Sequence, residues 1–222
     1  MKTTQTFARV LLPLLLPPLL AAATASTARA DAVDDAVRSV QHRWEQVTYE
    51  APAPARPQML EELAADAQKL SARYPDRAEP LVWEGIVVSS LAGEKGGLGA
   101  LGLAKRARGC YEKSLGIDDR ALDGSAYNSL GVLYYRVPGW PIGFGDRKKA
   151  EELIRKALAI NPDGIDPNYF YGDFLLSSGR PAEALPYLQR ALAAPPRPGR
   201  EIADKGRRAE AAALQEKARS QM

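Results

Sequence analysis

The sequence has 222 residues, of which 45% are hydrophobic, and it carries a formal net charge of +3 and a single cysteine. One cysteine excludes an internal disulfide, so an apolar core must stabilise the fold, and the chain is long enough to build one. The small charge excess gives no reason to expect nucleic acid or an anionic membrane as a partner.

Residues 1–30 have the features of a secretory signal peptide: a basic start, an apolar run from Val10, and the small-residue end Ala28-Arg29-Ala30. The run contains prolines and is shorter than the roughly 18 apolar residues of a membrane span. We therefore expect cleavage after Ala30, a periplasmic or secreted protein of residues 31–222, and no stable membrane insertion after cleavage. Because the segment contains basic but no acidic side chains, its removal lowers the net charge.

Residues 31–222 are predicted to form one domain of paired helices. The first pair, 31–77, has helices over 32–50 and 58–75, which a proline-rich link joins at 51–57. Its first helix fits the pattern of the later pairs poorly. Terminal units of repeat arrays are often atypical because one face is solvated.

The next three pairs share a spacing of small and large apolar residues. The last of them, 165–196, has Gly172 in its first helix and Ala184, Leu188 and Ala191 in its second. The same positions recur in the pairs 78–121 and 122–164, which hold Gly85, Ala107, Tyr111 and Ser114, and Gly131, Ala150, Ile154 and Ala157. Glycine and alanine let the two helix backbones of a pair approach closely.

This spacing resembles the tetratricopeptide repeat (TPR), a helix–turn–helix unit that stacks into superhelical arrays. The resemblance implies an all-α, TPR-like right-handed solenoid of about four helix pairs. A polar helix over residues 200–220 is expected to cap the array. In such a solenoid the first helix of each pair lines the concave face.

Two pairs contain insertions between their helices. Residues 93–102, GEKGGLGALG, are interpreted as a flexible or partly helical hairpin, because no strand precedes them and the GxxxxGK[ST] pattern of a phosphate-binding loop is absent. Residues 138–144, PGWPIGF, are stiffened by two prolines. The second insertion has two open roles: it contributes to binding, or it plugs a gap between neighbouring units. The first insertion is expected to lie alongside it.

Catalytic and metal-binding chemistry has little support in the sequence. His42 is the only histidine and Cys110 the only cysteine, and they fall in different predicted pairs. Structural zinc sites need four such ligands. The sequence therefore predicts a non-enzymatic protein with no cofactor, no metal and no catalytic residue. Cys110 is either a packed side chain or a reactive thiol.

The predicted function is recognition of another molecule. The candidate residues project from the concave face or from the second insertion, and they are Asn128, Tyr135, Arg136, Trp140, Phe144, Tyr169 and Asp173. They mix aromatic, amide and charged groups, as binding surfaces commonly do. For Tyr135 and Tyr169, packing between helices is an equally open interpretation.

A second, looser resemblance involves the segments YNSLGVLYY and GFGDRKKAEELIRKAL and the predicted signal peptide. They look like the exported T component of tripartite TRAP transporters. That resemblance implies a cavity for a small hydrophobic ligand, ligand delivery and a possible homo-oligomer. Two functions are therefore carried forward: an exported scaffold that binds an envelope protein or peptide, and a small-molecule binding protein. Nucleic acid is not an expected partner.

Overall fold

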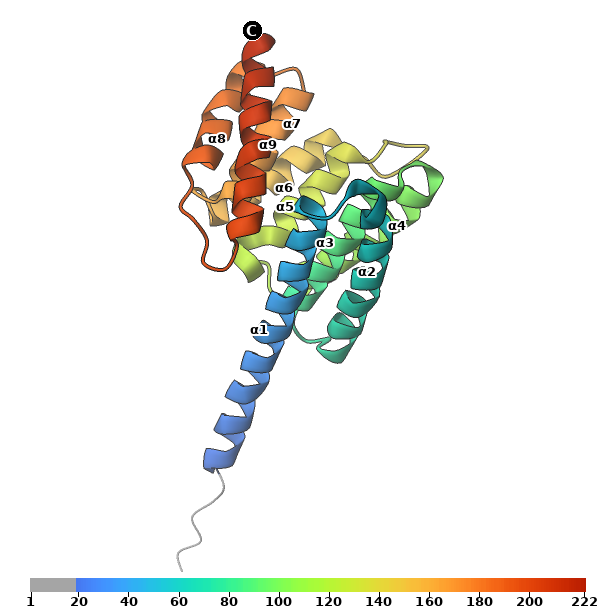
Figure 1. The fold of residues 1–222 in the computed structure, drawn as a ribbon, viewed down its shortest axis with the longest axis vertical. Helices are drawn as coiled ribbons and strands as arrows, with labels where there is room; N and C mark the ends of the chain where they lie inside the picture. The colour runs from blue at the N-terminus through green and yellow to red at the C-terminus, as the bar shows by residue number, and fades with distance from the viewer. Residues whose placement is uncertain (1–18) are drawn as a thin grey trace, which may run out of the picture.

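The computed structural model describes residues 19–222, and the regular secondary structure of these residues is helical. In chain order (Figure 1) the elements are α1 (Leu19–Tyr49), η1 (Ala53–Ala55), α2 (Arg56–Arg73), α3 (Ala78–Lys95), α4 (Gly97–Ile117), α5 (Ala121–Arg136), α6 (Arg147–Ile160), α7 (Ile165–Ser177), α8 (Pro181–Ala193) and α9 (Glu201–Ser220).

Consecutive helices pack against each other as pairs. The pairs α3–α4, α5–α6 and α7–α8 have the most extensive contacts, and α9 packs on α8 and α7. The first helices α1, α3, α5 and α7 also contact one another in sequence across the array. The predicted all-α, TPR-like solenoid of helix pairs with a capping helix is therefore confirmed.

The small residues of the repeat pattern are where the paired helices come closest. A Cβ atom added to Gly131 would lie 2.6 Å from Cγ1 of Ile154, and one added to Gly172 would lie 2.7 Å from the side chain of Leu188. A Cβ atom added to Gly85 would likewise lie too close to the ring of Tyr111, at 2.4 Å. One glycine on each of α3, α5 and α7 thus faces one large side chain on the partner helix, and this contact fixes the register of these three pairs.

The predicted signal peptide is only partly described. Residues 19–30 form the first turns of α1 and extend away from the helical body (Figure 1), while residues 1–18 lie outside the described residues. Within the described part of the chain, no helix is long and apolar enough to cross a membrane.

The glycine-rich insertion is not a separate hairpin loop. Residues 93–95 continue α3, residues 97–102 begin α4, and Gly96 alone lies between the helices with φ of 59°. Of the expected flexible or partly helical hairpin, the structure has the helical form, in which the segment extends both partner helices. Leucine and alanine alternate with the glycines here, and these good helix formers offset the unfavourable helix propensity of glycine.

The second insertion is an ordered loop between α5 and α6. The N–H of Gly145 donates to the carbonyl of Pro138 at 2.9 Å, and the N–H of Asp146 donates to the carbonyl of Tyr134 at 2.8 Å. The carboxylate of Asp146 then caps α6 by accepting from the N–H of Lys149 at 3.0 Å. We call residues 137–146 the Trp140 loop.

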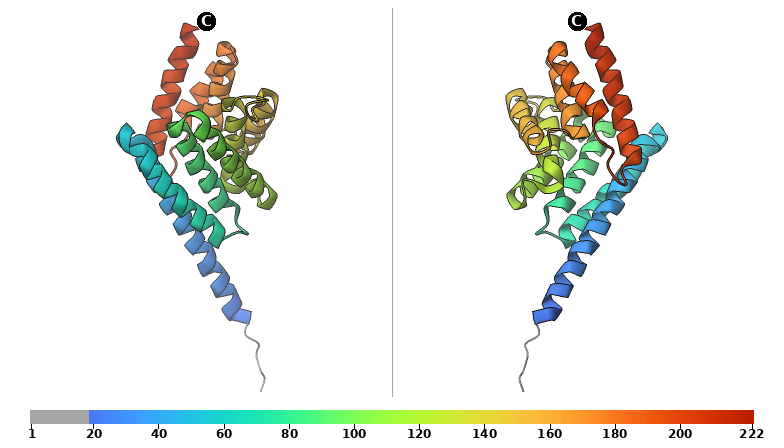
Figure 2. Two further views of the ribbon diagram at one scale, coloured as in Figure 1. Left: turned by 90° about the vertical axis from the view of Figure 1, so that its right-hand side faces the viewer. Right: turned by 90° about the vertical axis from the view of Figure 1, so that its left-hand side faces the viewer.

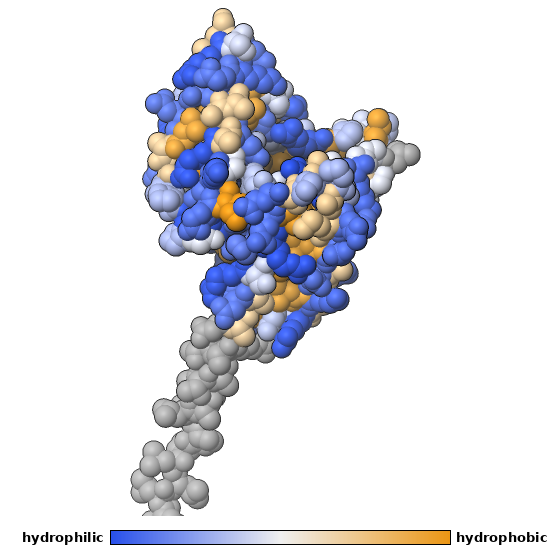
Figure 3. Space-filling view, in the orientation of Figure 1, coloured by the Kyte–Doolittle hydropathy of each residue, from blue (hydrophilic) through white to orange (hydrophobic). Residues whose placement is uncertain are grey.

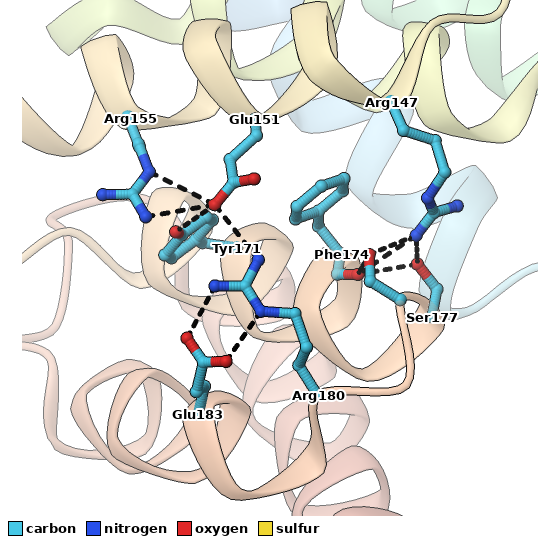
Figure 4. Close-up of polar contacts among 9 residues, drawn as sticks. Arg147, Glu151, Arg155, Tyr171, Phe174, Ser177, Arg180 and Glu183 are labelled. Atoms are coloured by element: carbon cyan, nitrogen blue, oxygen red, sulfur yellow. Dashed lines mark hydrogen bonds and ion pairs between the residues drawn. The ribbon is translucent and has the colours of Figure 1, made fainter.

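Polar side chains join successive repeats. Oε1 of Glu151 on α6 accepts from the hydroxyl of Tyr171 on α7 at 2.9 Å and pairs with Arg155 at 3.0 Å and Arg180 at 3.2 Å (Figure 4). Burial alone would raise the pKa of Glu151, but these hydrogen bonds outweigh it and lower the pKa. One carboxylate thereby links α6, α7 and the start of α8.

The array closes on itself, because the capping helix reaches back to the first helix. In the side views α9 meets α1 at an angle (Figure 2), and the two helices are in contact. Gly206 of α9 packs directly on the ring of Tyr49, and Arg200 forms an ion pair with Glu45, whose side chain is 1% exposed. Residues 155 positions apart therefore meet, and the concave side lies between α1 and α9.

Candidate binding site

The concave side between α1 and α9 contains a partly open cavity of about 700 Å³. Its lining comes from the first helices α1, α3, α5 and α7, from the end of α6, and from residues 195–210, which lead into and form part of α9. Ligand-binding pockets commonly have volumes of about 300–1,000 Å³. The closure by α1 and α9 thus produces a compartment of ligand size where an open solenoid would have a groove.

One wall of the cavity is aromatic. The rings of Trp44 and Trp83 meet edge to face with centroids 5.8 Å apart, and Nε1 of Trp44 donates to Ser90 at 2.8 Å. The hydroxyl of Tyr111 lies 3.0 Å from the hydroxyl of Ser89. Burial raises the pKa of Tyr111, so this phenol stays protonated at neutral pH. The wall offers flat apolar surfaces with a few fixed polar atoms.

Another part of the lining carries arginines that are paired with carboxylates. Asp166 accepts from Arg197 at 2.6 Å and from Arg207 at 2.9 Å. Arg197 also pairs with Asp204 at 2.7 Å, and Arg207 pairs with Glu210 at 2.6 Å. Burial alone would raise the pKa of Asp166, but the two arginines lower it to about 2. Each of these charges is compensated within the protein.

Two buried polar atoms of the lining have no partner. Nε1 of Trp83 and Oδ1 of Asn128 make no hydrogen bond to any described residue, although the side chains are only 3% and 4% exposed. Leaving a buried donor or acceptor unpaired costs about 1–3 kcal/mol each. The other two such atoms of the described residues, in Ser114 and Asn168, belong to side chains that do not line the cavity.

The predicted concave residues divide into two groups. Asn128 lines the cavity, as do Ile86, Ser89 and Val132 from the same predicted helix faces. Tyr135, Arg136, Tyr169 and Asp173 do not line it.

These four residues instead join helices to one another. The hydroxyl of Tyr135 donates to Oδ2 of Asp173 at 2.6 Å, and Arg136 forms an ion pair with the same carboxylate. Tyr169 packs on Phe170, and Arg207 stacks over both rings. The structure therefore places them in contacts between α5 and α7 and between α7 and α9.

The Trp140 loop lies outside the cavity, and its three large apolar residues have different environments. Trp140 is 90% exposed and Ile142 is 67% exposed. Phe144 packs edge to face on Tyr134 with centroids 5.6 Å apart, and Arg108 covers its other side at 4.7 Å. Hydrophobic groups are visible at the projecting corner of the molecule where this loop lies (Figure 3). The start of α4 lies alongside it, since Leu101 approaches Gly143.

The residues considered for catalysis do not form a site. Cys110 is buried in α4, and burial first, then the charge of Glu84, raises the pKa of its thiol to about 12. A thiol with this pKa is protonated at neutral pH and is a weak nucleophile. His42 is an exposed residue of α1 near Gln46. Among the described residues, no group of three potential metal ligands is found.

Sequence reasoning did not single out Trp83 or the arginine wall. The spacing pattern describes contacts inside a pair, whereas these residues act where the ends of the array meet. One signal was present, because residues 197–208, at the start of the expected capping helix, contain four arginines. That density is unusual for a purely solvated cap.

Comparison with known proteins agrees with this fold. Residues 142–217, from the Trp140 loop into α9, match the tetratricopeptide repeat family. The crystal structure of TTC0263, a thermophilic TPR protein in Thermus thermophilus, is 17% identical, covers 86% of this chain and 96% of that chain, and superposes with a TM-score of 0.54. The crystal structure of MamA is 19% identical, covers 78% of this chain and 95% of that chain, and has a TM-score of 0.45. No curated protein matches the sequence.

Proposed function

We propose that this protein is an exported, non-enzymatic TPR scaffold and that a partner protein docks on the Trp140 loop. TPR arrays suggest a scaffold for protein–protein interaction, and the repeat match supports that general role. The observation that carries the specific proposal is the exposure of Trp140 on an internally hydrogen-bonded loop. Export rests on the sequence of residues 1–30, and the N-terminal sequence of the secreted protein tests it.

The loop has the properties of an interaction anchor. Tryptophan is among the residues that contribute most to binding energy at interfaces. The backbone hydrogen bonds of the loop and the packing of Phe144 hold it in place, so that little conformational entropy is lost when a partner binds. Exposed apolar side chains this large are costly in water unless a partner covers them.

The charge around the loop indicates the chemistry of the partner. Residues 136–149 carry four exposed basic side chains, Arg136, Arg147, Lys148 and Lys149, against one exposed acidic side chain, Asp146. Complementary charge accelerates association and selects between partners. The partner surface is therefore expected to be acidic, with an apolar recess that accepts the indole.

Alanine variants of the loop test this proposal. The full chain is expressed in its native host, and proteins cross-linked to it are identified by mass spectrometry. Trp140→Ala and Ile142→Ala are expected to abolish capture of a specific partner and to weaken its affinity at least about tenfold, because central anchors contribute about 2 kcal/mol or more. Ile117→Ala, which alters an exposed isoleucine at the end of α4, is the matched control and should retain the partner. Equal capture by all variants would refute docking at this loop.

A second candidate function is small-molecule binding, as the resemblance to the T component implies. The observation that favours it is the partly open cavity with its aromatic wall. The two functions use different surfaces, since Trp140 and Ile142 do not line the cavity. Variants on one surface therefore leave the other available for measurement.

A further inference from the structure

We propose that the cavity binds an uncharged, flat molecule that offers one hydrogen-bond acceptor to Trp83 and one donor to Asn128. The proposal rests on the second candidate function and specifies its ligand chemistry. It differs from a site for a purely hydrophobic ligand, because it requires two polar contacts in addition to the aromatic wall.

The polar contacts follow from the two unpartnered atoms. Nε1 of Trp83 can only donate a hydrogen bond, and Oδ1 of Asn128 can only accept one. Trp44 shows the contrast within the same wall, because its Nε1 already donates to Ser90. Among the lining residues, Trp83 on α3 therefore keeps one unpaired donor and Asn128 on α5 one unpaired acceptor. Both atoms are almost fully buried, so a ligand with the opposite groups pairs with them when the two side chains turn toward the cavity.

The shape of the ligand follows from the walls that face the unpartnered atoms. Trp44, Trp83 and Tyr111 contribute aromatic rings to the lining, and Phe170 of α7 adds a further one. Flat molecules gain the largest contact area against such surfaces. An aromatic heterocycle of the amide type, in which a carbonyl and an N–H are part of one ring, combines this shape with the required acceptor and donor.

The absence of ligand charge follows from the pairing of the arginines. Arg197, Arg200 and Arg207 are the basic side chains of the lining, and each forms an ion pair with a carboxylate of the protein. An anionic ligand would have to displace Asp166 or Glu45 from its arginine partner. A cationic ligand would lie against the same guanidinium groups, and the lining carboxylates without an arginine partner, Asp123 and Asp163, are exposed to solvent. A neutral ligand leaves all of these pairs intact.

Nuclear magnetic resonance of the indole N–H groups tests the proposal directly. The protein has three tryptophans, so its 15N-labelled form gives three indole signals, which Trp→Phe variants assign. The probe is 2-quinolinone, a neutral bicyclic lactam. Its carbonyl is expected to shift the Trp83 signal strongly and the Trp44 signal less, because Trp44 is already bonded. The signal of Trp140, on the outer loop, should not move.

Matched probes and variants separate this ligand chemistry from the alternatives. Naphthalene has a similar ring system without polar groups, and 2-naphthoate adds a negative charge; both are expected to bind at least about tenfold more weakly than 2-quinolinone, the equivalent of one hydrogen bond of about 1.4 kcal/mol. Asn128→Leu, which retains the branched shape and the number of heavy atoms of the side chain, should reduce 2-quinolinone affinity by a similar factor and leave naphthalene binding unchanged. Trp140→Ala should bind 2-quinolinone as the parent protein does.

Three results would overturn the proposal. Tighter binding of naphthalene would indicate a hydrophobic ligand, and tighter binding of 2-naphthoate would indicate an anionic one. If no probe shifts the Trp83 signal up to its solubility limit, while the dispersion of the spectrum shows a folded protein, the cavity is a water-filled part of the fold. Loss of partner capture in Trp140→Ala with unchanged Trp83 shifts would support the outer interface independently of this result.

Discussion

Single glycines on the first helices determine how closely each pair packs. Gly131 has backbone atoms of its partner helix within reach of an added Cβ, since the carbonyl oxygen of Ala150 would lie 3.1 Å away and the amide nitrogen of Ile154 3.3 Å away. Gly109, in the middle of α4, has nothing within 4 Å of the same position. The two glycines therefore differ in packing although both are helical.

The first prediction uses this difference. Alanine has a better helix propensity than glycine by about 1 kcal/mol, so Gly109→Ala should stabilise the protein by about 0.5–1 kcal/mol. Gly131→Ala should lose that gain to overpacking and destabilise the protein by about 1–3 kcal/mol. Denaturant unfolding of both variants measures the free energies. Effects of the same sign and size would show that the pairs do not pack at the predicted glycines.

Asp166 gives the second prediction, which concerns pH. Its pKa is lowered from 3.8 to about 2, and its side chain is 30% exposed. A lowered pKa in the folded state adds stability above the unfolded value, and this stability is lost as the pH falls from about 4 towards 2. The shift corresponds to about 2 kcal/mol. Urea unfolding between pH 6 and 2 (roughly the span of the titration) measures the free energy of unfolding. This free energy should therefore fall less on acidification in Asp166→Asn than in the parent protein. The prediction is contradicted if the pH dependence of the free energy of unfolding is the same in Asp166→Asn as in the parent protein. It is also contradicted if Asp163→Asn, a change at an exposed neighbour, alters that pH dependence equally.

At the scale of helices and loops, the sequence predicted what depends on local spacing. The glycine and alanine positions of the last three pairs identified the paired helices, because they report contacts between neighbours in the chain. Residues 93–102 were expected to form a flexible or partly helical hairpin, and the structure has the helical form, since the leucines and alanines between the glycines extend α3 and α4. The prolines predicted a stiff Trp140 loop, and the loop is held by backbone hydrogen bonds. The different environments of its aromatic residues depend on tertiary packing, which the spacing of residues does not reveal.

The third prediction separates these environments. Phe144 contacts Tyr134 and Arg108, so Phe144→Ala should destabilise the protein by about 2 kcal/mol, less than the about 3–5 kcal/mol of a fully buried ring. Trp140→Ala removes an exposed ring and should change the free energy of unfolding by less than about 0.5 kcal/mol. Thermal and urea unfolding give both values. A large loss for Trp140→Ala would mean that the indole plugs the fold.

At the scale of the whole molecule, closure of the array decides which surfaces remain for binding. Asn128 was predicted from the concave helix face and does line the cavity, whereas Tyr135 and Asp173 from the same faces join helices. Sequence spacing predicts that helices pair, but not how strongly the stack curves. The contact of α9 with α1 depends on that curvature, so the cavity, Trp83 and the arginine wall could only be found in three dimensions.

The most direct test of this account is a double-mutant cycle across the closure, with Glu45→Gln, Arg200→Gln and the double variant. Both side chains are largely buried, and breaking such a pair by changing one partner destabilises proteins by about 3–5 kcal/mol. If α1 and α9 enclose the cavity, unfolding measurements should give a coupling energy above about 1 kcal/mol between residues 155 positions apart. Additive effects of the two substitutions, within about 0.5 kcal/mol, would show that the ends of the array do not meet.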